Sequence, residues 1–271
     1  MVVSIALYGI STVFYLSYLF LNKDKLQKFG YYLLLAGFLC HSTTIGYGFI
    51  KAGHLPVENL HQTLSFAGWA LAGMFLVLRY RYHIKVLGIY AVPLITLTMI
   101  MAYQLPAENA AAKTATLFKS IWLISHVSII FVGEAAFALA CGLGVLYILQ
   151  ENAIKRKHLG FFYKRLPALE LLDNTGYVCI MIGFTLLTLG LITGFVYAKT
   201  VWGNFWSWDP KEVWSGIAWL LYAALLHGRL ALGWRGRKAA IMSIIGFAVL
   251  LFTFLGVNLF LKGHHGEFTL M

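Results

Sequence analysis

Charged side chains are scarce in this sequence of 271 residues. Asp, Glu, Lys and Arg make up 11% of the chain, whereas 60% of its residues are hydrophobic and the mean hydropathy is +0.77. A soluble domain of this size carries roughly a quarter charged residues. Too few polar side chains remain to cover a surface exposed to water. The composition therefore argues against a soluble globular domain and indicates a protein that lies in lipid.

Cysteine pairs are also lacking. The three cysteines, Cys40, Cys141 and Cys179, each lie inside an apolar run, and no two of them form a Cys-x-x-Cys pair. An odd number of separated cysteines argues against a disulfide framework and against a cysteine zinc site. The sequence also contains no Cys-x-x-Cys-His segment, so the chain does not itself carry covalently attached c-type haem.

Long apolar runs dominate what is present. A helix that crosses a membrane needs about 20 apolar residues, and hydropathy predicts eight such helices. An all-α, polytopic membrane protein is therefore predicted, with 1–271 as a single transmembrane domain. The first run is not preceded by basic residues, as a cleaved signal peptide would be, and it is interpreted as a retained helix. The predicted spans are 4–21, 29–50, 62–79, 84–102, 121–150, 175–198, 213–230 and 239–261.

Lys and Arg are distributed unevenly among the predicted loops. Fifteen of the 21 fall in one set of alternating loops, and the positive-inside rule places that set in the cytoplasm. Both termini and the loops 51–61, 103–120 and 199–212 are then predicted on the outer face. Because the net charge of +11 mainly orients the helices, it does not indicate a nucleic-acid partner. The fifteen residues are Lys23, Lys25, Lys28, Arg79, Arg81, Lys85, Lys155, Arg156, Lys157, Lys164, Arg165, Arg229, Arg235, Arg237 and Lys238.

Tryptophan is concentrated in one outer loop, 199–213. Five of the eight tryptophans fall between 202 and 219, and the segment 201–214 reads VWGNFWSWDPKEVW. A belt of interfacial aromatic residues explains one or two tryptophans at a helix end, but rarely so dense a group. Asp209 suits a helix N-cap, Pro210 the first helical position and Glu212 the third, so these residues are predicted to start the seventh helix. The aromatic residues before them predict a slab that binds a large, flat, apolar ligand with a polar edge, and haem is the obvious candidate.

Three histidines are predicted near the depth of this loop. His126 lies just inside the outer end of the fifth span, and His264 and His265 lie just past the eighth. Imidazole is the usual axial ligand of haem iron, and two imidazoles on opposite sides give six-coordination. His126 could instead be a helix-end histidine that bonds a carbonyl oxygen. His54 and His61 flank the outer loop 51–61 and could compete as ligands.

Two further histidines lie within predicted spans. An ionisable side chain inside a membrane is by default a functional hypothesis. His227 lies near the cytoplasmic end of the seventh span and His41 near the middle of the second. At 1.5 Å of rise per residue their depths differ by roughly 13 Å, which makes them poor partners for one haem. A mate for His227 is expected from another protein, and His41 is interpreted as a hydrogen-bonded contact between helices. Glu134, inside the fifth span, receives no role.

The tryptophan loop also resembles a known signature. The segment 202–212, WGNFWSWDPKE, is similar to the WWD motif of haem-handling cytochrome c biogenesis proteins, in the form typical of the CcsA (ResC) family of system II. Neighbouring segments agree, with GFTLLTLG at 183–190, LHGR at 226–229 and GVN at 256–258. The resemblance is strong over roughly 120–265 and looser before that.

The resemblance implies a role in cytochrome c synthesis together with a CcsB (ResB)-type membrane partner. Haem b would be taken from the inner side of the membrane and presented at the outer face. Two external histidines would ligate the iron, and they map to His126 and most naturally to His265. The terminal GHHGE at 263–267 departs from the family's Gly-Leu-His-Ser-Tyr, so His264 remains an alternative. His227 maps to a membrane-embedded ligand whose mate lies on the partner, and the loop residues implied in haem binding are Trp202, Trp206, Trp208 and Asp209.

The implied chemistry is thioether formation between haem vinyl groups and the thiols of an apocytochrome c Cys-x-x-Cys-His segment. The protein's task in it is positioning, in a bacterial inner membrane or a thylakoid-type membrane with the active face extracytoplasmic. Three alternatives stay open: a haem exporter without lyase activity, a HemX-like regulatory or assembly protein, and a b-type electron carrier. The intact tryptophan loop argues against the HemX-like protein, and the absence of histidines paired at matched depths argues against the electron carrier.

Overall fold

The computed structural model describes residues 1–106, 120–157, 160 and 164–257, and this part of the chain contains eight α-helices and no strand. The all-α prediction is confirmed. The last helix continues directly into one turn of π-helix. The helices are α1 (Val2–Leu21), α2 (Asp24–Ala52), α3 (Leu60–Tyr82), α4 (Gly88–Gln104), α6 (Ile121–Lys155), α7 (Leu169–Trp202), α8 (Pro210–Ala231) and α9 (Arg237–Leu251), followed by the π-helix η2 (Phe252–Gly256).

The first seven predicted spans each fall on one helix, the eighth covers α9 and η2 and runs beyond the described residues, and the chain is an integral membrane protein with several crossings. Six helices in the described residues are long and apolar enough to cross a membrane, namely α1, α2, α3, α6, α7 and α9 with η2. Helix α4 is shorter, with 17 residues, and α8 is less apolar. The main differences lie at the helix ends: α6 extends to Lys155 and α7 begins at Leu169. Backbone hydrogen bonds continue a helix into polar residues that hydropathy does not count.

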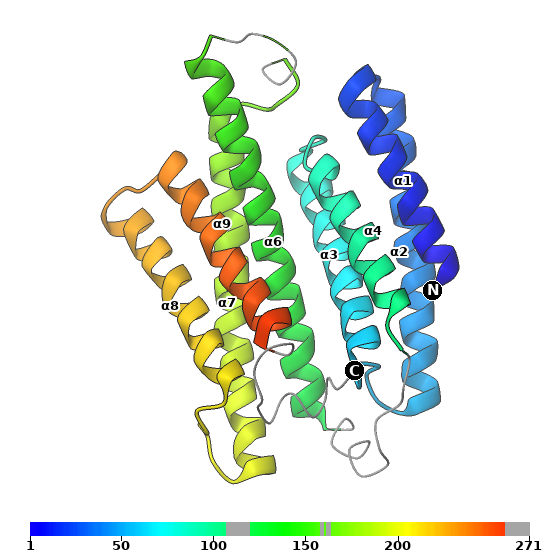
Figure 1. Ribbon diagram of the computed structural model, residues 1–271, viewed down its shortest axis with the longest axis vertical. Helices are drawn as coiled ribbons and strands as arrows, with labels where there is room; N and C mark the ends of the chain where they lie inside the picture. Colours follow the sequence, from blue (N-terminus) through cyan, green and yellow to red (C-terminus); the bar gives the residue numbers. More distant parts are fainter. Residues whose placement is uncertain (107–119, 158–159, 161–163, 258–271) are drawn as a thin grey trace.

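The helices form two groups that lie side by side (Figure 1). In the first group α1 packs against α2 and α4, and α3 packs against α4. In the second group α6 packs against α7 and α9, and α8 packs against α9. Helix α6 also contacts α3, so α6 is the element that joins the two groups.

The α6–α7 contact is close because glycines face it. A Cβ atom added at Gly183 would lie 2.8 Å from the ring of Phe137, and one added at Gly194 would lie 2.8 Å from Cε1 of His126. Small residues at membrane helix interfaces allow backbones to approach in this way. These two glycines of α7 therefore fix where the side chains of α6 lie.

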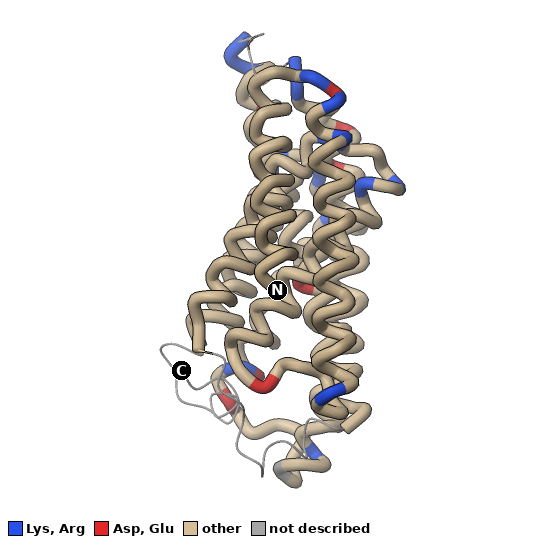
Figure 2. The backbone as a smooth tube through the Cα atoms, turned by 90° about the vertical axis from the view of Figure 1, so that its right-hand side faces the viewer, with Lys and Arg blue, Asp and Glu red and all other residues tan. Residues whose placement is uncertain are grey.

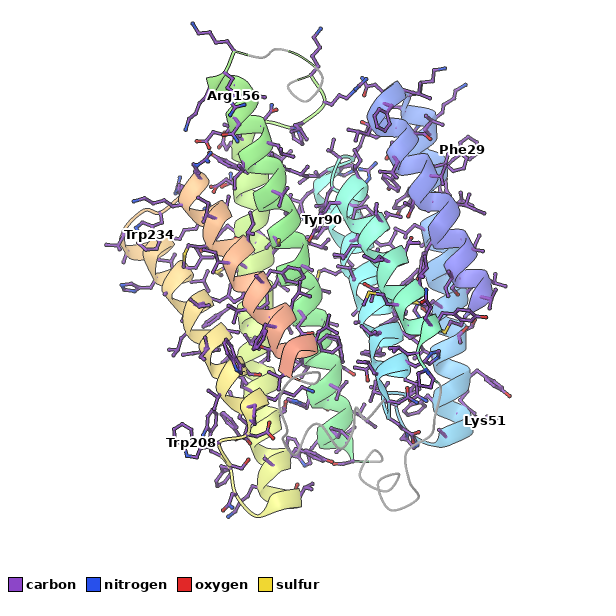
Figure 3. The ribbon with its side chains drawn as sticks, in the orientation of Figure 1. Phe29, Lys51, Tyr90, Arg156, Trp208 and Trp234 are labelled. Carbon is purple, nitrogen blue, oxygen red and sulfur yellow. The ribbon has the colours of Figure 1, made fainter. Side chains whose placement is uncertain are left out.

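Most of the basic residues lie at one end of the bundle, which we call the basic end (Figure 2). The connections α1–α2, α3–α4, α6–α7 and α8–α9 lie there, and Arg156 and Trp234 mark it in Figure 3. The opposite end carries the α7–α8 connection, and we call it the tryptophan end. The alternating loops that hold most of the Lys and Arg therefore share one end, as the sequence predicted.

A buried ion pair fastens the helices near the basic end. Arg229 donates to both carboxylate oxygens of Asp173 at 2.9 and 2.8 Å, and the side chains are 8% and 11% exposed. Asp173 also accepts a hydrogen bond from the backbone N–H of Gly236 at 2.9 Å. The guanidinium lies 4.4 Å from the ring centroid of Tyr177. This cluster links α7, α8 and the start of α9.

Candidate functional site

The tryptophan loop begins where α7 ends. Gly203 caps α7 with a φ of +78°, a conformation that glycine adopts without steric cost, and its N–H bonds the carbonyl oxygen of Lys199 at 3.2 Å. The Lys199 ammonium donates to the Gly203 carbonyl at 2.8 Å and lies 5.3 Å from the ring centroid of Phe205. Lys199 therefore closes the first turn of the loop and covers one of its aromatic rings.

A capping box ends the loop, as predicted from Asp209, Pro210 and Glu212. Asp209 is buried, and its carboxylate accepts from the backbone N–H of Lys211 at 2.9 Å. The Glu212 carboxylate accepts from the N–H of Asp209 at 3.2 Å, and from the N–H and hydroxyl of Ser207 at 2.8 and 3.0 Å. The two carboxylates thus hold the loop onto the start of α8.

The described tryptophans of the loop form a crossed pair. The indoles of Trp206 and Trp208 meet at 90° with centroids 5.7 Å apart, and Trp206 contacts Phe195 of α7 at 5.9 Å. Trp208 is 77% exposed and projects from the tryptophan end (Figure 3). Its φ of +60° is unusual for so bulky a residue. The Trp202 side chain lies outside the described part. The two visible rings do not make the flat slab expected from the sequence.

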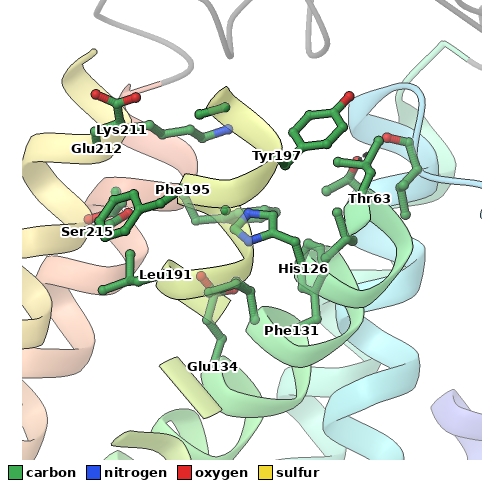
Figure 4. A pocket seen from close by; sticks show the side chains of 18 residues that line it. Thr63, His126, Phe131, Glu134, Leu191, Phe195, Tyr197, Lys211, Glu212 and Ser215 are labelled. Carbon is green, nitrogen blue, oxygen red and sulfur yellow. Dashed lines mark hydrogen bonds between the residues drawn. The ribbon is translucent and has the colours of Figure 1, made fainter. Parts of the chain in front are cut away.

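A cavity of about 220 Å³ opens beside the loop, among α6, α7, α8, η2 and the start of α3 (Figure 4). Its walls are mostly apolar, and Phe195 both lines it and contacts Trp206. Four lining residues carry a carboxyl, amine or imidazole group, namely His126, Glu134, Lys211 and Glu212, and Tyr197 adds a phenol. The remaining residues around it are Val57, Thr63, Leu123, Val127, Ile130, Phe131, Leu191, Gly194, Ala198, Ser215, Thr253 and Phe254.

His126 lies on the wall of this cavity in a defined tautomer. Its Nδ1 lies 2.7 Å from the carbonyl oxygen of Gly190. A carbonyl can only accept, so Nδ1 carries the proton and Nε2 carries the lone pair. The alternative of a helix-end histidine bonded to a carbonyl is therefore confirmed, but it does not oppose ligation. A histidine that binds a metal almost always donates its other N–H in this way.

The other predicted iron ligands lie elsewhere. His264 and His265 fall in 258–271, outside the described residues. His227 is exposed on α8 near the basic end, far along the helix from the cavity. Within the described residues, His227 therefore lies apart from His126.

His41 is a contact between helices, as predicted. It is fully buried, and its Nε2 lies 2.9 Å from the Ser65 hydroxyl of α3. Its Nδ1 lies 3.4 Å from the Tyr8 hydroxyl of α1, and the two rings meet edge to face. His41 therefore joins α1, α2 and α3.

His54 and His61, the possible competitors of His126, hold the α2–α3 connection. The Nδ1 of His54 lies 3.1 Å from the Leu55 carbonyl, and its Nε2 lies 2.9 Å from Glu58. The Nδ1 of His61 donates to the carbonyl of Ala102 at 2.7 Å. Neither lines the cavity. Since both ring nitrogens of His54 already contact acceptors, His54 is poorly suited to ligate a metal.

Sequence reasoning missed two members of the site, Glu134 and Lys211. Each carried a signal, because Glu134 is an ionisable residue inside a span and Lys211 directly follows the cap of α8. Both residues line one cavity only because α6 and α8 approach it from different sides. No spacing in the sequence reveals that arrangement.

Comparison with known proteins gives consistent relationships. Residues 57–265 match the family model described as cytochrome C assembly protein. The chain is similar to a "Cytochrome c biogenesis protein CcsA" of Microcystis aeruginosa (strain NIES-843 / IAM M-2473), with 32% identity over 84% of this chain and 83% of that one. It is 32% identical to a protein of the same name from Guillardia theta, over 93% of this chain and 89% of that one. Another protein of that name, from Prochlorococcus marinus, is 35% identical over 80% of this chain and 76% of that one.

Proposed function

Because the chain belongs to the cytochrome C assembly protein family, we propose that it binds haem beside His126 and presents it for covalent attachment to apocytochrome c. Family membership itself places the chain in cytochrome c maturation. The observation that carries the finer proposal is the His126 imidazole. Its tautomer is fixed on the wall of an apolar cavity that Phe195 connects to the tryptophan loop.

Iron ligation is the first element of the proposal. Nε2 of His126 supplies one axial ligand, and the Gly190 carbonyl holds the ring and raises its basicity. The second axial ligand comes from His265 or His264. Two neutral imidazoles stabilise the iron in its reduced, six-coordinate state, which attachment requires.

Presentation is the second element. The thiol S–H of the apocytochrome adds across a haem vinyl C=C: sulfur bonds one carbon, hydrogen bonds the other, and no oxidant is consumed. This chain contributes positioning rather than acid–base catalysis. Trp208, exposed at the end of the bundle, stacks on the porphyrin edge and holds it at the surface, while Trp206 supports the Trp208 ring edge to face.

The orientation in the membrane is the third element. The positive-inside rule places the basic end in the cytoplasm and the tryptophan end on the extracytoplasmic face of a bacterial inner membrane or thylakoid-type membrane. Haem then enters from the inner side. The exposed His227 on α8 binds it there together with a ligand from a CcsB-type partner, before transfer to His126.

The reduced absorption spectrum of the protein purified with its partner tests the proposal. Wild type is expected to carry non-covalent haem with a six-coordinate spectrum, and His126→Ala to lose that haem or become five-coordinate. His61→Gln is the matched control, since His61 lies at the same end but outside the cavity. An unchanged spectrum in His126→Ala, or a haem-free wild type, would refute the site.

A further inference from the structure

An amine and a carboxyl group, those of Lys211 and Glu134, line the cavity beside His126. Lys211 extends over it from the first turn of α8, and Glu134 approaches it from α6 on the side nearer the membrane interior (Figure 4). The remaining walls are mostly apolar. A charge placed against apolar walls is costly unless it is paired.

The other carboxyl group and the imidazole of the cavity already make hydrogen bonds within the chain. Glu212 accepts three hydrogen bonds from the tryptophan loop, and Nδ1 of His126 donates to the Gly190 carbonyl. In the part of the chain that the structure describes, neither the Lys211 ammonium nor the Glu134 carboxylate makes a hydrogen bond or a direct ion pair. Both line the same cavity, where opposite charges on an ammonium and a carboxylate attract each other. They are therefore the groups that remain to recognise a ligand.

The ligand that suits this arrangement is a large apolar molecule with carboxylates on its edge, and haem carries two propionates. We propose that Lys211 binds a haem propionate, and that Glu134 is the counter-charge that holds Lys211 in the cavity while no substrate is bound. This inference rests on the haem site proposed above. In this arrangement a haem propionate contacts Lys211 of α8, and the haem iron is bound by His126 of α6.

Two fixed points would also set the rotation of the ring. A haem held only at iron can turn about the bond to Nε2 of His126, so its vinyl groups face no fixed direction. A propionate held by Lys211 removes that freedom. Lys211 is linked through Asp209 to the tryptophan loop, so the loop and the propionate anchor move as one unit.

Titration of the purified complex with haem and with haem dimethyl ester, followed by the Soret absorption, tests this assignment. The ester keeps the iron and the ring but has no propionate charge. Wild type should bind haem roughly 10- to 100-fold more tightly than the ester, as expected for a charge-assisted contact away from bulk water. Lys211→Met should lose this preference and bind the ester as wild type does, which shows that the variant is folded.

Two further variants sharpen the test. Lys211→Arg keeps the positive charge and should keep the preference for haem. Glu134→Gln removes the competing carboxylate and should bind haem more tightly, with unchanged ester binding. The opposite directions expected for Lys211→Met and Glu134→Gln separate charge recognition from damage to the cavity.

The outcomes that would overturn the proposal are distinct. If wild type binds haem and ester equally tightly, Lys211 is not a propionate anchor, although the haem site stands. If Lys211→Met and Lys211→Arg both lose ester binding, Lys211 is structural. A weaker affinity for haem in Glu134→Gln would refute the counter-charge role. If wild type binds neither ligand, the haem site itself is wrong and this assignment fails with it.

Discussion

Gly194 of α7 offers a way to disturb haem ligation without touching a ligand. A Cβ atom added there would lie 2.8 Å from Cε1 and 3.0 Å from Nδ1 of His126, both on the imidazole ring. Ordinary van der Waals contact begins at 3.4 Å, so Gly194→Ala must push the ring away by about 0.6 Å or turn it. The bond from Nδ1 to the Gly190 carbonyl is 2.7 Å long and would be lengthened or lost.

The expected magnitude follows from these contacts. Loss of the hydrogen bond costs about 1 kcal/mol, and overpacking costs a further 1–3 kcal/mol. Disturbing the group that orients a metal ligand typically lowers affinity about 10- to 100-fold. Haem titration of Gly194→Ala should therefore show a loss in that range, with the reduced spectrum shifted toward five-coordination.

Gly176→Ala is the matched control on the same helix. A Cβ atom there would meet only Cβ of Leu143, at 3.8 Å, which is ordinary contact. Alanine in place of glycine favours helix α7 by about 1 kcal/mol in both variants, so the difference between them isolates the contact with His126. If Gly194→Ala binds haem as tightly as Gly176→Ala does, the imidazole is not held in the way that we describe.

Two other perturbations address the loop and the basic end. Trp208→Gly relieves the positive φ, so the thermal stability of the haem-free protein should be unchanged or higher, while covalent haem attachment falls. A loss of thermal stability in the haem-free variant would contradict this. Arg229→Met leaves Asp173 as a buried, unpaired charge and should lower the free energy of unfolding in detergent by about 3–5 kcal/mol. Arg237→Met, which breaks the more exposed pair with Glu151, should cost less than about 1 kcal/mol, and equal losses would contradict the role of burial.

The sequence predicts the fold well because the membrane simplifies the problem. A span must satisfy its backbone hydrogen bonds internally, so each long apolar run becomes a helix, and α1, α2 and α3 follow directly. The capping box at Asp209 and Glu212 is equally local, because its donors and acceptors lie within a few residues. Features that depend on interactions between residues close in the sequence can therefore be predicted without a structure.

The cavity could not be predicted from the sequence in the same way. Its lining comes from α3 and the connection before it, α6, α7, α8 and η2, and the contacts of α7 depend on glycines such as Gly194, whose role is visible only against the side chain opposite. The same holds for the tryptophans, where the motif predicts an aromatic cluster but not the 90° crossing of Trp206 and Trp208. Side-chain directions in a loop depend on individual backbone angles, such as the φ of +60° at Trp208.

His126 as a helix-end contact and His126 as an iron ligand require the same hydrogen bond. A histidine that only stabilises a helix end needs one acceptor, and the Gly190 carbonyl supplies it. A histidine that ligates iron needs the same acceptor to orient its ring. The hydrogen bond alone cannot distinguish them. What favours ligation is the place of the ring. His41 lies within a packed core, whereas His126 lies on the wall of a cavity that Lys211 also lines and that Phe195 connects to the tryptophan loop.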